Sequence, residues 1–458
     1  MERDIPQIGG SSGSGVVPGI GFPIATTVRD ALYDRIPLSD PELALISTPA
    51  FLRLERVQQL GFVSRIWPGA RHARYDHSLG VLHLTRLALA HLHGVGASAW
   101  MMAEDARTLA AAALLHDVGH YPFSHAIEEL GTPVVPHEAV GARLVEGPEI
   151  APILREQWGV DPARVAAIID PRRGGLTQTD HVLRGLLSGT LDMDKLDYLP
   201  RDARACNVPY GGVDTARLID ALRVAEVGIE GRAPERRIVI GAKGVSALHS
   251  LINARQEMFD NIYWHHTNRA CMAMLLRAVQ EALVAGALAP DDLTLLDDAT
   301  LLTLLADSAM PAPTRRLTAA LRERRIHKRA VEVSNRAIEV YGRLGNLYFD
   351  PAARRDVEIR VTEALGTALG APVPPEAILI DIPKPERWRT DAWVQFDRPP
   401  LGFQPLMPWK DVVGLSDEDF QRYEEHRRLI RIVAAEPYRD ALATHWEDIL
   451  LPQLGGVV

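Results

Sequence analysis

LLHDVGHYPFSHAIEE (Leu114 to Glu129) is the stretch that decides the fold, because it joins the apolar end of a predicted helix to a dense group of polar side chains. His116 and Asp117 stand side by side in it, and His120 follows one helical turn after His116. The two imidazole rings are therefore expected on one face. Burying so many polar groups among apolar neighbours is costly unless they share a partner. The stretch favours a helical protein with a metal-binding centre.

Two further segments supply ligand types that complete such a centre. His77 lies in RHARYDHSLGVLHL (residues 71–84), at the start of a predicted amphipathic helix, and Asp194 lies in TLDMDKLDYLPRDA (residues 190–203). Two histidines and two aspartates from three helices would leave coordination positions open for water and substrate. The alternatives are a hydrogen-bonded core histidine for His116, a helix cap for Asp194 and a surface ion pair for His77. Together, the two histidines and two aspartates favour a metal site over these alternatives.

Composition narrows the class of protein. The chain has 458 residues, of which 47% are hydrophobic and 24% charged, which is typical of globular proteins and excludes fibrous or wholly disordered ones. Neither a membrane-spanning apolar run nor a secretory signal is recognisable, and Cys206 and Cys271 are predicted to be buried thiols, so we expect a cytoplasmic protein. A net charge of −9 makes a nucleic-acid partner improbable, but it permits a local phosphate pocket.

The pattern along the chain predicts a mainly α protein with a smaller mixed α/β lobe at its C-terminus. Residues 1–25, rich in Gly, Ser and Pro, are expected to form a flexible tail, and residues 26–344 a helical core. Residues 345–458 are expected to form the mixed lobe, packed on that core. Within this lobe we predict strands at 357–361, 377–382 and 392–396, and helices at 417–434 and 437–450.

Three blocks carry a resemblance to a known family. RYDHSLG (residues 74–80), LLHDVGHYPFSH (residues 114–125) and DMDKLDYLPRDA (residues 192–203) resemble the signature blocks of the HD superfamily. More narrowly, they resemble the deoxynucleoside triphosphate (dNTP) triphosphohydrolase branch, typified by the SAM-and-HD-domain protein. The likeness extends over residues 48–78 and 252–266, whereas the residues before Thr26 are too few for a SAM domain. A helical HD-domain core is the fold that this resemblance implies.

The resemblance implies a metal site and an acid–base group. The metal ligands of the family fall on His77, His116, Asp117 and Asp194, and Fe, Mn, Zn, Ni or Co would suit them, with Mg as a possible companion of the phosphates. By this resemblance, His125 acts on the scissile phosphate ester, with Glu128 and His137 as its supporting partners. His120 matches a family histidine near the phosphates. The family commonly has Asp where this chain has Glu128.

Substrate contacts follow from the same resemblance. Gln59 and Asp202 match residues that hydrogen-bond the 3′-hydroxyl, Leu60 matches one that crowds a 2′-hydroxyl, and Tyr198 would stack under the sugar. Arg74, Lys195 and Arg255 match the cations that bind the triphosphate in this family. Tyr263 matches a residue at the far wall of the pocket. A triphosphate needs such cations, although a solvated salt bridge is the commoner fate of any single Arg or Lys.

Regulation is expected to differ from that of the family. Its guanine-nucleotide activator site uses Asp, Gln and Arg where this chain has Ser47, Leu52 and Glu55, so we expect no activation by GTP through that route. A second nucleotide effector site is matched in part, by Arg223, Lys243 and His265. The family resemblance also implies homo-oligomers, dimers or tetramers, with effectors between subunits.

The function predicted from these residues is metal-dependent hydrolysis of a dNTP to deoxynucleoside and triphosphate, which would serve control of the dNTP pool. One alternative is an HD phosphodiesterase or nucleotidase that acts on another nucleotide. Another is an HD protein that binds nucleotide or single-stranded nucleic acid without turnover. The sequence leaves the metal, the base preference and the number of subunits open.

Overall fold

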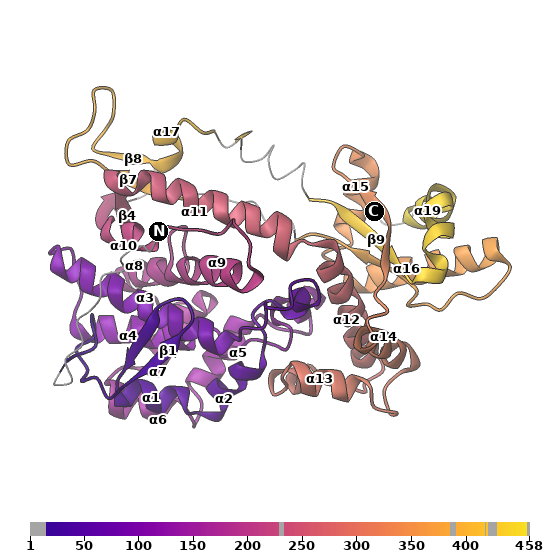
Figure 1. Ribbon diagram of the computed structural model, residues 1–458, viewed down its shortest axis with the longest axis horizontal. Coiled ribbons are helices and arrows are strands. Elements are labelled where there is room, and N and C mark those ends of the chain that lie inside the picture. The colour runs from indigo at the N-terminus through magenta and orange to yellow at the C-terminus, as the bar shows by residue number, and fades with distance from the viewer. Residues whose placement is uncertain (1–14, 229–232, 385–390, 417, 420–427, 456–458) are drawn as a thin grey trace.

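The computed structural model describes residues 15–228, 233–384, 391–416, 418–419 and 428–455 (Figure 1). It is mainly helical with small sheets, as the sequence predicted. A first lobe holds most of the N-terminal half, and a second lobe is built around a small sheet near the C-terminus (Figure 1). The helices of the first lobe are α1 (Asp40–Ile46), α2 (Pro49–Leu52), α3 (Arg74–Gly94), α4 (Ala103–Leu115), α5 (His137–Val145), α6 (Ala151–Ile153), α7 (Pro162–Ile169), α8 (Gln178–Leu187), α9 (Met193–Cys206), α10 (Thr215–Asp220) and α11 (Val245–Met258).

Helix α4 is the centre of the first lobe. Its sequence is rich in alanine and leucine, the residues that favour a helix most, and residues 109–115 have no exposed surface. The carboxylate of Asp105 accepts a hydrogen bond from the Met102 amide at 2.6 Å and so satisfies a backbone donor at the N-terminus. Helices α3 and α7 pack against α4. Because the C-terminal half of α4 is buried on all sides, the residues that follow Leu115 start from a fixed position.

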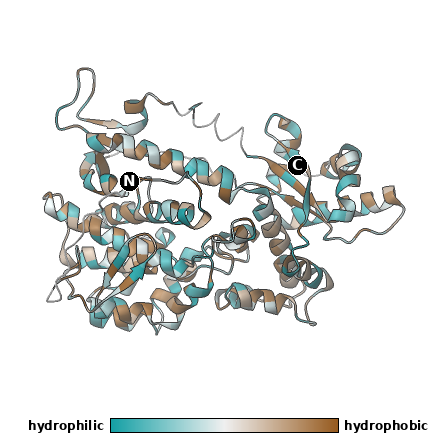
Figure 2. Cartoon of the chain, viewed as in Figure 1, coloured by the Kyte–Doolittle hydropathy of each residue, from teal (hydrophilic) through white to brown (hydrophobic). Residues whose placement is uncertain are grey.

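The second lobe is organised around the strand β9 (Ile430–Ala434), which is completely buried. It lies between β5 (Lys328–Val333) and β6 (Ile378–Asp381) and is antiparallel to both. Apolar residues, brown in Figure 2, run along this sheet and the helix faces turned toward it. The helices of this lobe are α12 (His266–Val284), α13 (Asp298–Leu305), α14 (Ala312–Arg322), α15 (Ile338–Asn346), α16 (Pro351–Leu369) and α19 (Glu436–Leu450).

The secondary structure predicted for the C-terminal part is confirmed in some segments and wrong in others. Strands do form within 377–382 and 392–396, and a helix covers 437–450. Residues 357–361, predicted as a strand, lie inside α16, where Val357, Val361 and Leu365 are buried at helical spacing on one face. Of the helix predicted over 417–434, residues 417 and 420–427 lie outside the described residues, and its end is the strand β9.

A segment of the expected C-terminal lobe returns to the first lobe. The strand β7 (Trp393–Gln395) pairs in parallel with β4 (Glu235–Gly241), in a sheet of order β3-β4-β7-β8 with β3 (Leu222–Val227) and β8 (Leu406–Pro408). Trp409, in α17 (Trp409–Val413), is fully buried there. Residues 391–416 therefore differ from the expectation of one lobe over 345–458, because Ala392, Val394 and Trp409 are buried in the core of the first lobe.

The predicted tail is also partly folded. Residues 1–14 lie outside the described residues, but Val17 is fully buried and its amide donates to the Phe22 carbonyl at 2.7 Å. A hairpin of β1 (Thr26–Asp30) and β2 (Asp34–Leu38) follows directly. Residues 15–25 thus pack on the core, because Val17 and its apolar neighbours offset the flexibility that Gly and Pro suggest.

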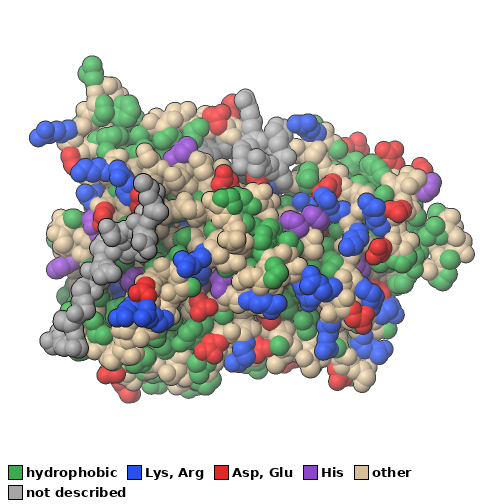
Figure 3. Space-filling model, viewed as in Figure 1, with side chains coloured by type: hydrophobic (Ala, Val, Ile, Leu, Met, Phe, Trp, Pro, Cys, Tyr) green, Lys and Arg blue, Asp and Glu red, His purple; other side chains and the backbone are tan. Residues whose placement is uncertain are grey.

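Surface features agree with the composition. Acidic and basic side chains are interspersed over the face shown in Figure 3. Within the described residues, none of the helices combines the length and the apolar character that crossing a membrane would require. Cys206 and Cys271 are both buried and unpaired, as predicted.

Gly119 provides a test of the packing around the motif. A Cβ atom at this position would lie 2.2 Å from the Gly141 amide nitrogen and 2.2 Å from the His137 carbonyl oxygen, both in α5. We expect Gly119→Ala to destabilise the protein by about 1–3 kcal/mol, because backbone atoms must move. Thermal unfolding measures the loss. Gly94→Ala is the control, since a Cβ there meets nothing within 4 Å; equal melting temperatures for both variants would contradict the packing.

Candidate metal centre and active site

The ends of three helices bring the four predicted metal ligands together. His77 lies in the first turn of α3, His116 caps the C-terminus of α4 with Asp117 directly after it, and Asp194 lies in the first turn of α9. Helix α3 packs against both α4 and α9, so these ends meet at one point. The side chains are therefore fixed by buried helices rather than by mobile loops.

The distances place all four donor sets around one small volume. His77 Nε2 lies 3.0 Å from Asp194 Oδ1 and 3.7 Å from Asp117 Oδ2. His116 Nε2 lies 3.3 Å from Asp117 Oδ1 and 3.8 Å from Asp194 Oδ1. The alternative of a simple surface ion pair for His77 is excluded, because the His77 side chain is 1% exposed.

The donor atoms fit a divalent cation. His116 Nδ1 lies 2.8 Å from the Ala113 carbonyl oxygen, to which it donates, so Nε2 is the ring atom that faces the carboxylates. This buried Nε2 has no hydrogen-bond partner among the described residues. A buried ring nitrogen that faces two carboxylates without a hydrogen bond is well placed to be a metal ligand. Two imidazoles and two carboxylates suit Fe, Mn, Zn, Ni or Co.

A second layer of residues, which the sequence analysis missed, orients His77. The Nδ1 atom of His77 donates to Asp197 Oδ2 at 2.8 Å, and Asp197 also accepts from Arg201 at 2.8 and 2.9 Å and from the Tyr33 hydroxyl at 2.8 Å. Asp197 and Arg201 stand one helical turn apart in α9, and this spacing was the available signal. Gly80 makes the contact possible, because a Cβ there would lie 1.9 Å from Asp197 Oδ1.

Buried charges shift the pKa values of the ligands. Burial lowers the pKa of His77, but hydrogen bonds to Asp194 and Asp197 outweigh burial and raise that pKa to about 10. Burial likewise raises the pKa of Asp117, and the charge of Arg74 more than reverses this effect, so the pKa lies well below its usual value. The Arg74 guanidinium donates to Asp117 Oδ2 at 2.6 Å, which places this predicted phosphate contact directly on a ligand.

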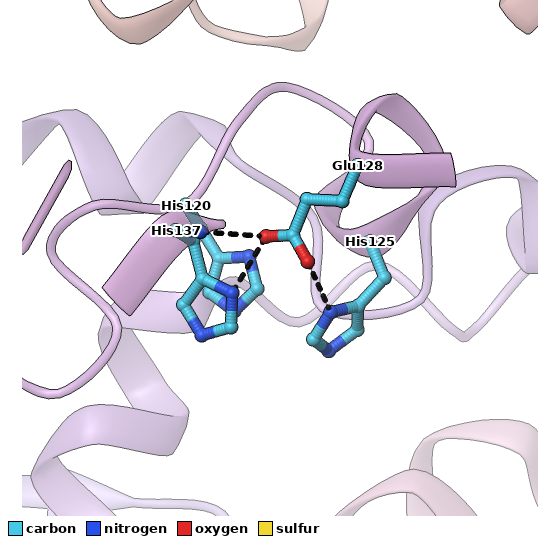
Figure 4. Close-up of side chains that lie close together, drawn as sticks. All are labelled: His120, His125, Glu128 and His137. Atoms are coloured by element: carbon cyan, nitrogen blue, oxygen red, sulfur yellow. Dashed lines mark hydrogen bonds and ion pairs between the residues drawn. The ribbon is translucent and has the colours of Figure 1, made fainter. Parts of the chain in front are cut away.

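Next to these ligands, the predicted acid–base residues form a second cluster (Figure 4). Glu128 Oε1 accepts hydrogen bonds from His137 Nδ1 at 2.6 Å and from the His137 amide at 3.0 Å. Its other oxygen lies 3.5 Å from His125 Nδ1, so the longer glutamate side chain reaches both histidines. The His125 side chain is 63% exposed, which leaves its Nε2 edge open to a ligand.

His120 connects the two clusters. Its Nε2 atom lies 3.1 Å from Asp117 Oδ1, and its ring stacks on the ring of His137 with centroids 3.7 Å apart. Burial and the charge of Arg74 lower the pKa of His120 well below its usual value, so the ring is neutral. Donor atoms of His120, His125, Glu128 and His137 lie within 4.8 Å of one another, so this cluster too has the composition of a cation site.

Two residues of the second lobe, also missed, hold the segment that carries His125. This segment, η3 (Ser124–Leu130), is entered through Phe123 with a positive φ of 57°. Asp298 accepts hydrogen bonds from the amides of Phe123 at 2.7 Å and Gln58 at 3.0 Å. Arg269 donates to Glu129 at 2.8 Å and also contacts Asp381. No sequence signal links these residues, because 112 to 240 positions separate the partners.

The predicted sugar contacts lie on the other side of the metal ligands. Asp202 accepts from the Tyr263 hydroxyl at 2.7 Å, and His72 Nε2 lies 2.7 Å from its other oxygen. The Tyr198 ring lies between Tyr263 and His77, with centroids 6.3 and 6.4 Å away. Gln59 Oε1 is buried without a hydrogen-bond partner among the described residues, which leaves an acceptor for a ligand hydroxyl.

The other predicted contacts are brought together only in part. Lys195 donates to Asp192 at 2.5 Å and to the Gly189 carbonyl at 2.9 Å, and it lines one cavity with Arg255. Leu60 is half-buried and packs against the core of the first lobe. Of the predicted effector residues, Arg223 and Lys243 precede α11 and His265 follows it, separated along the chain by a helix about 21 Å long. Within one chain this effector site stays a prediction.

With this geometry in place, comparisons with known proteins add two matches. A family model for the HD domain matches residues 74–203, and one for the HD associated region matches residues 213–396. The chain therefore contains an HD domain followed by an HD associated region. The four metal ligands and the three signature blocks all lie within the first of these ranges.

Relatives of this chain include uncharacterized proteins and a named enzyme. The uncharacterized protein YwfO of Bacillus subtilis is 33% identical over 52% of this chain and 51% of its own length. Human deoxynucleoside triphosphate triphosphohydrolase SAMHD1 is 28% identical over 56% of this chain and 44% of its own length. The chain thus spans about half the length of the curated relatives it matches. A crystal structure of a hypothetical protein from Aquifex aeolicus shares the fold, with a TM-score of 0.68 and 24% identity, over 92% of this chain and 99% of that one.

Asp197 allows a test of the metal centre that leaves the four ligands in place. Asp197→Asn removes the charge that orients His77, so we expect divalent-metal affinity to fall about 10–100-fold. Calorimetric titration of the stripped protein with Mn²⁺ or Ni²⁺ measures the fall, and circular dichroism checks the fold. Asp161→Asn, at the cap of α7, is the control. Unchanged affinity in Asp197→Asn would contradict the site.

The raised pKa of His77 predicts proton release on metal binding. Since the pKa is about 10, His77 holds a proton on each nitrogen at pH 7 when no metal is bound. A cation at Nε2 must displace one, so metal binding at pH 7 should release about one proton and affinity should rise with pH. Calorimetry in two buffers of different ionisation enthalpy measures the release. A heat independent of the buffer would contradict this protonation state.

Proposed function

We propose that this protein is a metal-dependent dNTP triphosphohydrolase, which converts a dNTP and water to a deoxynucleoside and triphosphate. The observation that carries the proposal is the arrangement of groups around the metal ligands. Tyr198 and Tyr263 lie beside His77, and His120 links the ligand Asp117 to His125. This arrangement suits a substrate whose sugar would lie at the tyrosines and whose α-phosphate would lie at the metal ligands, with the 5′-oxygen, which departs with the sugar, within reach of His125.

The metal ligands would hold a divalent cation, which would polarise the phosphate and lower the pKa of bound water. Around it, the residues of this chain position and transfer protons. His125 is exposed and hydrogen-bonds through Nδ1 toward Glu128, so its Nε2 can protonate the departing 5′-oxygen. His137 holds Glu128 at 2.6 Å and so keeps the carboxylate ionised and directed at His125. His120 stays neutral, so its ring adds no second positive charge beside Arg74.

The negative charge of the triphosphate would be offset by cationic side chains near the metal ligands. Arg74 is 3% exposed and already neutralises Asp117, so its remaining effect is to stabilise charge that builds on the phosphoryl oxygens. Lys195 directly follows the ligand Asp194, and Arg255 lines the same cavity as Lys195. Such an arrangement suits three linked phosphates better than the single phosphate of a nucleotidase substrate.

Selection of a deoxyribose would depend on the orphaned acceptor of Gln59. An acceptor buried without a partner favours a ligand with a hydroxyl at that point, here the 3′-hydroxyl. The half-buried Leu60 beside it would oppose a 2′-hydroxyl. The activity for which the relative SAMHD1 is named supports the same substrate class for this chain. Assembly into a homo-oligomer and a nucleotide effector are part of the proposal.

His125→Asn tests the proposal. Loss of the general acid should lower kcat about a hundredfold to ten-thousandfold, while the metal content stays that of the wild type, because His125 is outside the four ligands. Each dNTP and rNTP is incubated with the protein and several divalent metals, and chromatography identifies the products. Triphosphate and deoxynucleoside are the expected products.

The exposed His445 in α19 supplies the matched control, since His445→Asn makes the same histidine-to-asparagine change away from the metal ligands. Release of orthophosphate or diphosphate instead of triphosphate would refute the proposed reaction. Full activity in His125→Asn would refute the assigned role of this histidine.

A further inference from the structure

A large cavity opens beside the metal ligands. It has a volume of about 1150 Å³ and lies between α8, β4, the start of α9, α11 and the segment around Trp393. Lys195 and Arg255 form part of its wall, so it begins where the triphosphate of the proposed substrate would lie. Pockets for drug-sized ligands usually measure roughly 300–1,000 Å³. The cavity therefore has room for more than the phosphates of one nucleotide.

The wall of the cavity is cationic although the chain is acidic. Five Arg and Lys side chains and two acidic side chains line it, whereas the whole chain has a net charge of −9. A concave surface with one excess sign of charge concentrates the electrostatic potential within it. The charge of its wall therefore favours anionic ligands.

Most of these cations have partners within the protein. Arg237 pairs with Asp391 at 2.6 Å and with Glu235 at 3.0 Å, and Arg236 pairs with Glu226 at 3.2 Å. Lys195 pairs with Asp192 at 2.5 Å. These pairs hold the wall in shape and leave part of each cation directed to the cavity.

Arg184 differs from the others. It is half-buried, its Nε atom is buried without a hydrogen-bond partner, and no acidic group lies within 4.0 Å of its guanidinium among the described residues. Helix α8 fixes its place, because Leu183 and Leu186 are buried and the helix packs against β4. A buried Nε–H donor without a partner is costly, and an anionic ligand at this guanidinium would offset that cost.

We propose that this cavity binds a linear polyphosphate chain longer than three phosphates, with Arg184 holding the part beyond the third. The orientation of the chain, with its first phosphates at Lys195 and Arg255, rests on the proposed function. Either a free inorganic polyphosphate or the 5′ chain of a nucleotide presents this chemistry. The protein thus takes phosphate chains that extend past a triphosphate.

Binding of inorganic chains to the purified full-length protein tests this site without any need for hydrolysis. We expect a longer linear polyphosphate of defined length to bind about tenfold more tightly than inorganic triphosphate, since it gains one charged hydrogen-bonding group. Arg184→Gln should abolish this gain and keep the affinity for triphosphate. Arg155→Gln, an exposed arginine outside the cavity, should keep the gain. The matched variants also cancel any chelation of metal by the chains.

A second arm compares a deoxyadenosine tetraphosphate with dATP on the same variants. A gain with the tetraphosphate assigns the site to nucleotide-borne chains, and a gain only with the inorganic chain assigns it to free polyphosphate. Equal affinities for short and long chains in the wild type, or a gain that survives in Arg184→Gln, would overturn the proposal. Because binding is measured apart from turnover, failure of dNTP hydrolysis and failure of this site give different results.

Discussion

The hydrogen bond from His77 to Asp197 is the interaction on which the rest of the site depends. Asp197 is fully buried and accepts hydrogen bonds from His77, Arg201 and Tyr33, while Arg201 also donates to Asp30 at the end of β1. Removing one partner of a buried charge network commonly costs about 3–5 kcal/mol, because the others are left unpaired. The same network therefore joins the N-terminal hairpin, α3 and α9 and sets the direction of the His77 ring.

A second constraint links the two lobes to the chemistry. The acid–base residues stand on a short segment that would otherwise be a surface loop, and the second lobe holds it through Asp298 and Arg269. Arg269 is 4% exposed and binds Glu129 and Asp381 together, so the position of His125 depends on the sheet that contains Asp381. Burial raises the pKa of Asp298 to about 6, so its grip on the Gln58 and Phe123 amides is sensitive to pH near that value.

Local patterns predicted that residues 26–344 are mainly helical, because hydrophobic periodicity is a property of short segments. These patterns failed where the same composition is compatible with both a helix and a strand. Val357 and Val361 are β-branched and favour a strand in isolation, but their spacing buries both on one face of α16. The strand β7 was predicted, yet its partner β4 lies more than 150 positions earlier. Such pairings depend on which apolar faces meet, and no single segment holds that information.

By itself, the sequence determined the helical class and the types of side chain at the centre: two imidazoles and two carboxylates in blocks similar to those of the HD superfamily. Tertiary structure alone decided that each imidazole lies within 4 Å of both carboxylates and that Asp197, Gly80 and Arg269 support the site. It also decided that Arg184 faces a cavity. The physical reason is that residue chemistry is local, whereas distances between segments follow from the packing of buried faces across the whole chain.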